Sequence, residues 1–260
     1  MTPLLQVKNV TKKFGGLTAN NDVTFDVAEG EILSVIGPNG AGKSTLFKMI
    51  SSFMPTTSGE VIYKGEKISN NKPHIIAQKG VVRTFQETTI FKSMTVRESV
   101  VLAQHLRATA TLPGYFFGTK AAHHDEEAFG RSADELLEFL GMSAIKNEQA
   151  SNLPQGNLRA LGIAIGLATD PKVLLLDEPF AGMNHDETTK MVELVRSVRD
   201  EKGVTVMLVE HDMPAVMSIS DRIVVLNFGE KIAEGTPIEI QNNERVIEAY
   251  LGSADDEIGM

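Results

Sequence analysis

Gly37-Pro-Asn-Gly-Ala-Gly-Lys43-Ser44-Thr45 carries the strongest structural signal in this 260-residue sequence. Gly37 and Gly42 are separated by four residues and followed by a lysine and a serine, which is the pattern of a phosphate-binding loop. The apolar run Ile32 to Ile36 precedes the loop, and a helix-like run follows it to about Ile50. Glycines let backbone N–H groups turn inward, and a helix N-terminus adds partial positive charge, so this order suits bound phosphate. The sequence therefore predicts a polyphosphate-binding loop.

Every residue of this loop is a candidate nucleotide contact: Gly37, Pro38, Asn39, Gly40, Ala41, Gly42, Lys43, Ser44 and Thr45. In such loops the lysine ammonium, here Lys43, reaches the β- and γ-phosphates, and the Ser44 hydroxyl is a ligand of Mg²⁺. The alternative is a glycine-rich turn with an exposed lysine and no ligand.

Two carboxylates, Asp177 and Glu178, follow the apolar run Val173 to Leu176. Placing carboxylates at the end of a buried strand is costly unless a cation or a reaction uses them. We expect Asp177 to join the Mg²⁺ shell and Glu178 to act as the general base on an attacking water. The alternative is a strand end that emerges into solvent.

His211 follows another apolar run, Thr205 to Val209, in the string Glu210-His211-Asp212. Because the carboxyl ends of parallel strands meet at one edge of a sheet, we expect His211 beside the same site, in contact with a γ-phosphate. The alternative is a structural histidine.

Short strand-like runs alternate with helix-like runs along the chain, which is typical of an α/β fold. The continuous apolar runs near residues 173 and 204 favour a parallel sheet covered on both faces. Alternation at Val23, Phe25 and Val27 favours an additional antiparallel sheet built from the first third of the chain. The expected strands are Leu4–Val10, Val23–Val27, Glu31–Ile36, Val61–Tyr63, Val81–Phe85, Val173–Leu176, Val204–Val209 and Arg222–Leu226. We interpret residues 1–260 as a single domain.

Between about residues 91 and 167 the strand-like runs disappear, which predicts a helical subdomain. Thr95-Val-Arg-Glu98 has the form of a capping box and predicts the start of a helix. Ser132-Ala-Asp-Glu135 predicts the start of a second helix. Residues 108–129 are expected to form an irregular excursion, with His123-His124 in a solvated loop rather than in a metal site.

Composition limits the possible functions. The chain has 25 Lys and Arg against 34 Asp and Glu, a formal net charge of −9, and a pI near 5.2. This charge argues against a protein that coats nucleic acid or anionic lipid, although it leaves room for a local basic patch. The absence of cysteine excludes a disulfide framework, thiolate metal sites, iron–sulfur clusters and a cysteine nucleophile. The longest uncharged apolar stretch, Ala160 to Thr169, is about half a bilayer-spanning helix, so we expect a chain that is soluble or peripheral to a membrane through a partner.

Together these motifs resemble those of the ATP-binding-cassette (ABC) ATPases over nearly the whole chain. The resemblance implies a P-loop NTPase (RecA-like) core with an antiparallel β-subdomain and an α-helical subdomain. It implies hydrolysis of ATP with Mg²⁺, and it adds Gln86 as a metal contact and catalytic residue beside Glu178 and His211. It also places Phe14 on the adenine base, although Phe14 taken alone could equally belong to the core. In this family each ATP lies between the phosphate loop of one subunit and the signature motif of another.

Several strings are similar to the branch of the family that serves branched-chain amino acid importers and their urea and amide relatives. They are Val81-Val-Arg-Thr-Phe-Gln86, the excursion at 108–129, Gly182-Met-Asn184, Glu210-His-Asp-Met213 and Arg245-Val-Ile-Glu-Ala-Tyr-Leu-Gly252. This resemblance implies two ATPase subunits at the cytoplasmic face of the cell membrane, two integral permeases and an external solute-binding protein, with no nucleic acid partner. We therefore expect an ATP-hydrolysing subunit of an importer for branched-chain amino acids or related small polar solutes. The alternatives are a soluble non-transport ABC ATPase and a regulatory ATP-binding module.

The signature motif departs from the family pattern Leu-Ser-Gly-Gly-Gln. That pattern would fall on Leu153-Pro154-Gln155-Gly156-Asn157, of which Leu153 and Gly156 match. Pro154 offers a phosphate neither an N–H nor a hydroxyl, and Gln155 places a side chain where the family has glycine. A homodimer would carry this weakened motif at both sites, so we expect a second ATPase with an intact signature. A slow homodimer is the alternative.

Phe85, Ile90, Phe91 and Met94 are apolar residues in a segment expected at the surface. They predict that the groove between the Gln86 segment and the following helix receives a helix of a permease. Alternatively, these side chains are buried within the chain.

Overall fold

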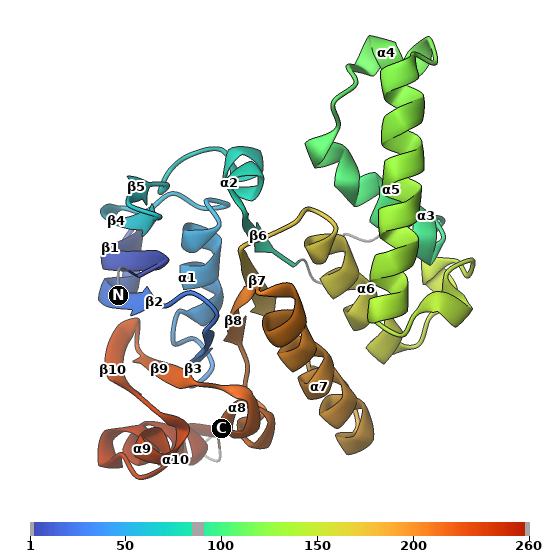
Figure 1. The fold of residues 1–260 in the computed structure, drawn as a ribbon. Coiled ribbons are helices and arrows are strands. Elements are labelled where there is room, and N and C mark those ends of the chain that lie inside the picture. The colour runs from blue at the N-terminus through green and yellow to red at the C-terminus, as the bar shows by residue number, and fades with distance from the viewer. Residues whose placement is uncertain (1–2, 85–90, 258–260) are drawn as a thin grey trace.

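The computed structural model describes residues 3–84 and 91–257, which form two β-sheets surrounded by helices (Figure 1). A four-stranded antiparallel sheet has the order β2-β1-β4-β5, and a six-stranded sheet has the order β10-β9-β3-β8-β7-β6. Within the larger sheet β10 is antiparallel to β9, and the other neighbours run parallel. The strands are β1 (Leu5–Phe14), β2 (Leu17–Val27), β3 (Ile32–Ile36), β4 (Ser58–Tyr63), β5 (Glu66–Lys67), β6 (Val81–Arg83), β7 (Val173–Asp177), β8 (Thr205–Val209), β9 (Arg222–Asn227) and β10 (Glu230–Gly235).

Helix α2 lies between β5 and β6, helices α3 to α6 form a group between β6 and β7, and the other helices follow strands of the larger sheet. The α-helices are α1 (Lys43–Ile50), α2 (Pro73–Lys79), α3 (Val96–Gln104), α4 (Leu112–Phe116), α5 (Lys120–Phe139), α6 (Gln155–Leu167), α7 (His185–Lys202), α8 (Met213–Ile219), α9 (Pro237–Gln241) and α10 (Glu244–Glu257). Short 3₁₀ turns are η2 (His105–Arg107), η3 (Ser143–Ile145) and η4 (Ala150–Asn152).

Alternate residues of the parallel strands face two different cores, because successive side chains of a strand point to opposite faces. Leu33 and Val35 of β3 belong to a buried cluster that also contains Phe47 of α1 and residues of the antiparallel sheet. Ile32 and Ile36 of the same strand belong to a cluster shared with α3, α5, α6 and α7. The larger sheet is therefore covered on both faces, as its continuous apolar strands predict.

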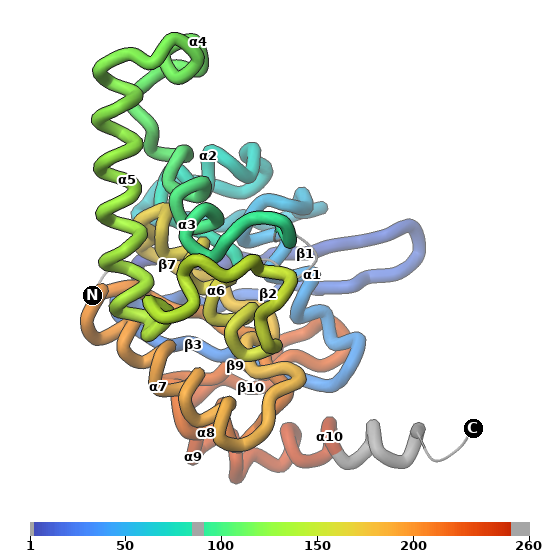
Figure 2. Tube along the Cα trace, turned by 90° about the vertical axis from the view of Figure 1, so that its right-hand side faces the viewer, coloured from blue at the N-terminus to red at the C-terminus, as the bar shows by residue number. Residues whose placement is uncertain are grey.

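The group α3 to α6 lies to one side of the sheets, with α4 and the start of α5 at its far end (Figures 1 and 2). The predicted capping box at Thr95 is present, because its hydroxyl accepts from the Glu98 N–H and the Glu98 carboxylate accepts from the Thr95 N–H. The limits of this group at 91 and 167, and the single-domain interpretation, remain predictions.

Two expectations for this group are wrong. No helix begins at Ser132, which lies inside the 20-residue helix α5. Residues 108–129 are largely helical rather than irregular, since Thr111 caps α4 and Thr119 caps α5 through side-chain oxygens. His123, His124, Glu126 and Glu127 are exposed on α5, where outward-facing polar side chains are compatible with a helix, whereas Asp125 is buried.

Strand β5 was missed because it has only two residues, and β10 because charged residues interrupt its apolar pattern. Within the described residues, no helix has the length and apolar character needed to cross a membrane.

Candidate functional site

The phosphate loop joins β3 to α1 at the carboxyl edge of the larger sheet. Gly37 has φ of 149° and Gly42 has φ of 96°, in a region that disfavours residues with a side chain. A Cβ at Gly37 would lie 2.0 Å from the Leu226 carbonyl oxygen, and one at Gly42 would lie 2.4 Å from the Ala19 carbonyl oxygen. Both glycines are therefore required by neighbouring strands as well as by the turn.

Lys43 is the first residue of α1, and its ammonium lies inside the loop. Its Nζ donates to the carbonyl oxygens of Gly37 at 2.6 Å and Pro38 at 2.9 Å. Burial lowers the pKa of Lys43, and the nearby carboxylates of Glu178 and Asp177 oppose that shift. The loop lysine and the two predicted carboxylates thus share one electrostatic site, although they are more than 130 residues apart in sequence.

Asp177 ends β7 and is 6% exposed. Its Oδ2 accepts from the Arg83 guanidinium at 2.5 Å. The side chain of Asp177 alone is 3% exposed and that of Arg83 is 10% exposed. The Oδ1 of Asp177 is buried and has no hydrogen-bond partner among the described residues. A divalent cation fits such an oxygen, since carboxylate and hydroxyl oxygens are preferred ligands of Mg²⁺. Ser44, exposed in the first turn of α1, has the second oxygen of the predicted ligand set.

Glu178 directly follows β7 with φ of 49°, a left-handed conformation that is uncommon for a residue with a side chain. Its N–H donates to the Val209 carbonyl oxygen at 2.9 Å, and its carbonyl accepts from the Ala181 N–H at 3.3 Å. Strand β8 and the turn at Ala181 therefore hold the backbone of Glu178 in a strained conformation, which is a frequent feature of functional positions.

Glu210 connects the ends of β7 and β8. It is 1% exposed, and its carboxylate accepts from the N–H groups of Phe180 at 2.7 Å, His211 at 2.9 Å and Asp212 at 3.4 Å. Burial raises the pKa of Glu210, while the hydrogen bonds from these three N–H groups lower it. The Glu210 carboxylate thereby fixes the backbone of His211, whose own side chain is 63% exposed.

Phe14 and Gln86 are the remaining residues of the predicted site. Phe14 ends β1, is 45% exposed, and has the Lys12 ammonium 5.1 Å from its ring centre. It lies in the same hairpin as Ala19 and Asn20, which contact Gly42. Gln86, predicted as a metal contact and catalytic residue, lies outside the described residues.

The degenerate signature forms the start of a regular helix. Pro154 is the N-cap of α6 and provides no side-chain hydrogen bond to the helix. The Gln155 side chain lies against Gly182, where a Cβ would be 3.7 Å from the Gln155 Cγ. The helix N-terminus required by the family pattern is thus present without the serine hydroxyl.

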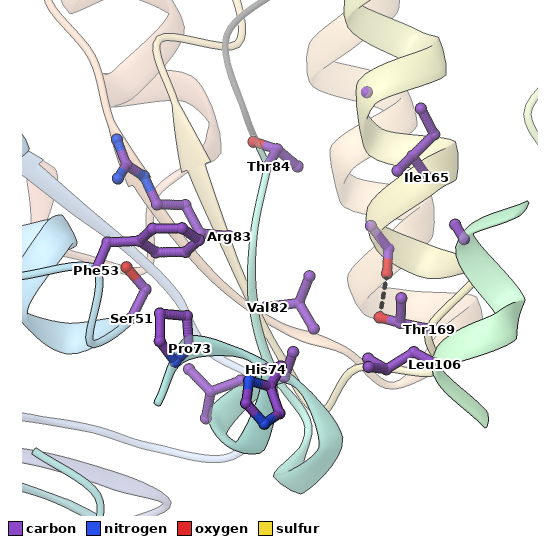
Figure 3. Close-up of a pocket in the computed structure, with 15 residues that line it drawn as sticks. Ser51, Phe53, Pro73, His74, Val82, Arg83, Thr84, Leu106, Ile165 and Thr169 are labelled. Carbon is purple, nitrogen blue, oxygen red and sulfur yellow. Dashed lines mark hydrogen bonds between the residues drawn. The ribbon is translucent and has the colours of Figure 1, made fainter. Parts of the chain in front are cut away.

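An apolar pocket of about 550 Å³ opens between α2, β6 and α6 (Figure 3). Val82, Arg83 and Thr84 line one side, and Leu106 and Ile165 line another. Arg83 therefore borders this pocket and also binds Asp177 of the phosphate site.

Comparison with known proteins identifies the chain. Residues 20–181 match the family model described as ABC transporter. The chain belongs to the ABC transporter family. A second model, described as branched-chain amino acid ATP-binding cassette transporter, matches residues 230–256 of this ABC subunit.

Individual relatives agree with these matches. The ABC subunit is 44% identical to the high-affinity branched-chain amino acid transport ATP-binding protein BraF of Pseudomonas aeruginosa, over 97% of this chain and 99% of BraF. It is 43% identical to LivG of Escherichia coli K12, which has the same description, over 97% and 99% of the two chains. A crystal structure of a nucleotide-free ATP-binding cassette from an ABC transporter superposes with a TM-score of 0.85 at 30% identity, covering 96% of this chain and 99% of that one.

These findings confirm the predicted family, the α/β fold with a P-loop NTPase core, and the expected function as an ATP-hydrolysing ABC transporter subunit. They favour this function over the soluble ATPase and the regulatory module. Sequence analysis missed Arg83 and Glu210 as parts of the site. Glu210 stands next to His211 in the string that was singled out, but no local pattern pairs Arg83 with Asp177.

Proposed function

We propose that this ABC subunit supplies the energy for import of branched-chain amino acids or related small polar solutes. It acts at the cytoplasmic face of the membrane, with two permeases, a second ATPase and an external solute-binding protein. The observation that carries the proposal is the Lys43, Asp177 and Glu178 cluster, in a chain similar to BraF over nearly its whole length.

The chemistry is hydrolysis of the γ-phosphate of ATP. Inward-facing N–H groups of the phosphate loop and the Lys43 ammonium bind the β- and γ-phosphates, with Lys43 exchanging its loop carbonyls for phosphate oxygens. Glu178 accepts a proton from the attacking water, and His211 contacts the γ-phosphate. Mg²⁺ held by Ser44, Asp177 and Gln86 would neutralise charge on the phosphates. Phe14 provides an exposed ring for the adenine base.

The apolar pocket is the proposed docking site for a permease helix. It is lined by α2, β6 and α6, and Thr84 at its edge immediately precedes the segment that contains Gln86. Phe91, at the far end of that segment, is 63% exposed, whereas Phe85 and Ile90 lie outside the described residues. Arg83 lines the pocket and also donates a hydrogen bond to Asp177. A permease helix in the pocket would therefore contact a residue that is bonded directly to the proposed metal ligand.

Crosslinking tests the docking site, because the chain has no native cysteine. Single cysteines at His74, which lines the pocket, and at Lys92 are expected to crosslink to the permeases. A cysteine at Glu193, exposed on α7, is the matched control. Crosslinking from Glu193 alone would contradict the proposed site.

The second ATPase is proposed from the signature. Each lost amide or hydroxyl contact to developing phosphate charge costs about 3 kcal/mol in a dry site, so a partner with an intact signature gives a faster site than self-pairing. The test compares ATP hydrolysis by the isolated chain and by Pro154→Ser/Gln155→Gly. We expect the double variant to be faster. Rapid hydrolysis by the parent, with no gain in the variant, would contradict the need for a second ATPase.

The solute class is tested with the reconstituted complex. ATP hydrolysis is measured with the binding protein and a panel of solutes that includes leucine, isoleucine, valine, urea and short amides. We expect stimulation by branched-chain amino acids. Stimulation by an unrelated solute class alone would contradict the proposed cargo.

A further inference from the structure

The end of the helical group farthest from the sheets exposes large apolar side chains. We call residues 107–120 the aromatic tip. Leu112, Phe116 and Phe117 in the aromatic tip are 87%, 84% and 77% exposed. The rings of Phe116 and Phe117 lie edge to face, with centres 5.2 Å apart. Adjacent apolar side chains with this exposure are characteristic of an interaction surface.

The aromatic tip is held in place rather than left as a loose loop. Asp125 of α5 is 4% exposed and accepts hydrogen bonds from the Thr109 N–H at 2.9 Å, the Thr109 hydroxyl at 2.8 Å and the Ala110 N–H at 2.9 Å. It also accepts from the Tyr115 hydroxyl at 2.9 Å. The Tyr115 ring in turn lies 5.3 Å from the ring of His105. The Asp125 carboxylate therefore holds residues 109–110, which precede α4, as well as Tyr115 within α4. The three exposed apolar side chains are thereby presented together.

The aromatic tip itself has a positive formal charge, unlike the chain as a whole. Between Ser99 and His124 the sequence contains no aspartate or glutamate, although the whole chain carries 34 of them and a net charge of −9. The same stretch contains Arg107 and Lys120, one at each end of the aromatic tip. Asp125, Glu126 and Glu127 follow directly on α5, so the attraction of an anionic surface depends on Arg107 and Lys120, which flank the apolar side chains.

The aromatic tip projects beyond the rest of the molecule. Two views at right angles place α4 at the extreme end of α5, beyond α2 (Figures 1 and 2). Leu106, the residue before the aromatic tip, lines the apolar pocket, so the chain passes directly from the pocket to the tip. The tip is a projection rather than a groove, which suits insertion into a soft surface.

We propose that the aromatic tip binds an anionic lipid bilayer, with Leu112, Phe116 and Phe117 in the headgroup and upper acyl region and Arg107 and Lys120 beside lipid phosphates. Aromatic and leucine side chains flanked by cations are the residues that favour the membrane interface. Leu106 connects the aromatic tip to the proposed permease site. The expectation that the tip faces the membrane therefore rests on the proposed function. Lipid binding itself requires no permease or solute.

The absence of tryptophan from the chain allows a direct measurement. Phe117→Trp places a single tryptophan in the aromatic tip of the full-length protein. Phe228→Trp is the matched control, because Phe228 is 86% exposed in the turn between β9 and β10. Each purified protein is titrated with vesicles of phosphatidylcholine alone and of phosphatidylcholine with phosphatidylglycerol, and tryptophan emission is followed.

We expect a blue shift for Phe117→Trp with the anionic vesicles, a partition coefficient at least about tenfold lower with neutral vesicles, and no shift for Phe228→Trp. Adding Lys120→Glu to Phe117→Trp lowers anionic partitioning about fivefold or more. Adding Phe116→Ser to Phe117→Trp also lowers partitioning onto the anionic vesicles. All these positions are at the surface, and circular dichroism verifies that each variant is folded.

Three results would overturn the proposal. They are unchanged emission of Phe117→Trp on anionic vesicles, equal shifts at residues 117 and 228, and equal partitioning on neutral and anionic vesicles. Emission that shifts with reconstituted permeases in detergent but not with vesicles would assign the aromatic tip to a protein contact instead. None of these results depends on ATP hydrolysis or import, so failure here is distinguishable from failure of the proposed function.

Discussion

The Arg83 guanidinium donates to Oδ2 of Asp177 at 2.5 Å, and both side chains are nearly excluded from solvent. Asp177 is the predicted metal carboxylate, while Arg83 ends the strand that leads into the segment containing Gln86. Arg83 thus supplies a positive charge that balances Asp177. This ion pair links the phosphate site to the edge of the apolar pocket.

Arg83→Met is expected to destabilise the nucleotide-free protein by about 3–5 kcal/mol, because Asp177 would be left buried without a counter-charge. For a chain of this size the melting temperature falls by roughly 10 °C. Mg²⁺ with ADP should restore much of the loss, since a cation then balances Asp177. Differential scanning fluorimetry with and without MgADP measures both effects.

Arg131→Met is the control for this variant. Arg131 forms a surface ion pair with Glu127 at 3.8 Å, and its loss costs at most about 0.5 kcal/mol. An Arg83→Met protein as stable as Arg131→Met would contradict the role given to the buried pair.

Lys43→Ala is expected to weaken ATP binding by about 1.5–3 kcal/mol, because a charge-assisted contact with the polyphosphate is lost. Isothermal titration calorimetry compares it with Lys48→Ala, which removes an exposed lysine in the last turn of α1. Equal ATP affinity in the two variants would show that Lys43 does not bind phosphate.

Glu210→Gln is expected to lower the stability by about 1–3 kcal/mol, because an amide nitrogen cannot accept from the backbone N–H groups that the carboxylate serves. Since Glu210 positions His211 and does not touch phosphate, kcat should fall while the KM for ATP stays near the parental value. Glu193→Gln on the exposed face of α7 serves as the control. A raised KM with unchanged kcat would contradict this positioning role.

Asp134 makes part of the stability of the helical group dependent on pH. Hydrogen bonds from Arg97 and Lys146 lower the pKa of Asp134 from 3.8 to about 2. A carboxylate with a lowered pKa stabilises the folded state above pH 3.8, and this contribution is lost as the pH falls toward 2. Urea unfolding should therefore show a gap between the parent and Asp134→Asn at pH 5 that closes near pH 2. A gap that is constant with pH would contradict the ion-pair contribution.

The phosphate loop was predictable because its pattern is local. Ile32–Ile36, the glycines and the helix from Lys43 occur in one continuous stretch, and the chemistry of the loop depends on that order. The start of α5 was not predictable in the same way. Asp125 is polar and interrupts the apolar pattern of that helix, but its four hydrogen-bond contacts come from residues 10 to 16 positions earlier in the chain.

Long-range contacts explain the residues that sequence analysis missed. Arg83 and Asp177 are 94 residues apart, and Phe180 and Glu210 are 30 residues apart. Both contacts arise because neighbouring strands β6, β7 and β8 end at the same edge of the larger sheet. A single sequence without the sheet order does not reveal which strand ends are neighbours.

Solute uptake driven by a complex that contains Glu178→Gln is the most direct test of the account. The parental and variant complexes are reconstituted in vesicles with MgATP on the side of this subunit, and uptake of a branched-chain amino acid is measured together with MgATP binding. Loss of the general base should slow uptake and hydrolysis together by about 10²- to 10⁴-fold while MgATP remains bound. Uptake at the parental rate by the Glu178→Gln complex would contradict the claim that hydrolysis at Glu178 drives import.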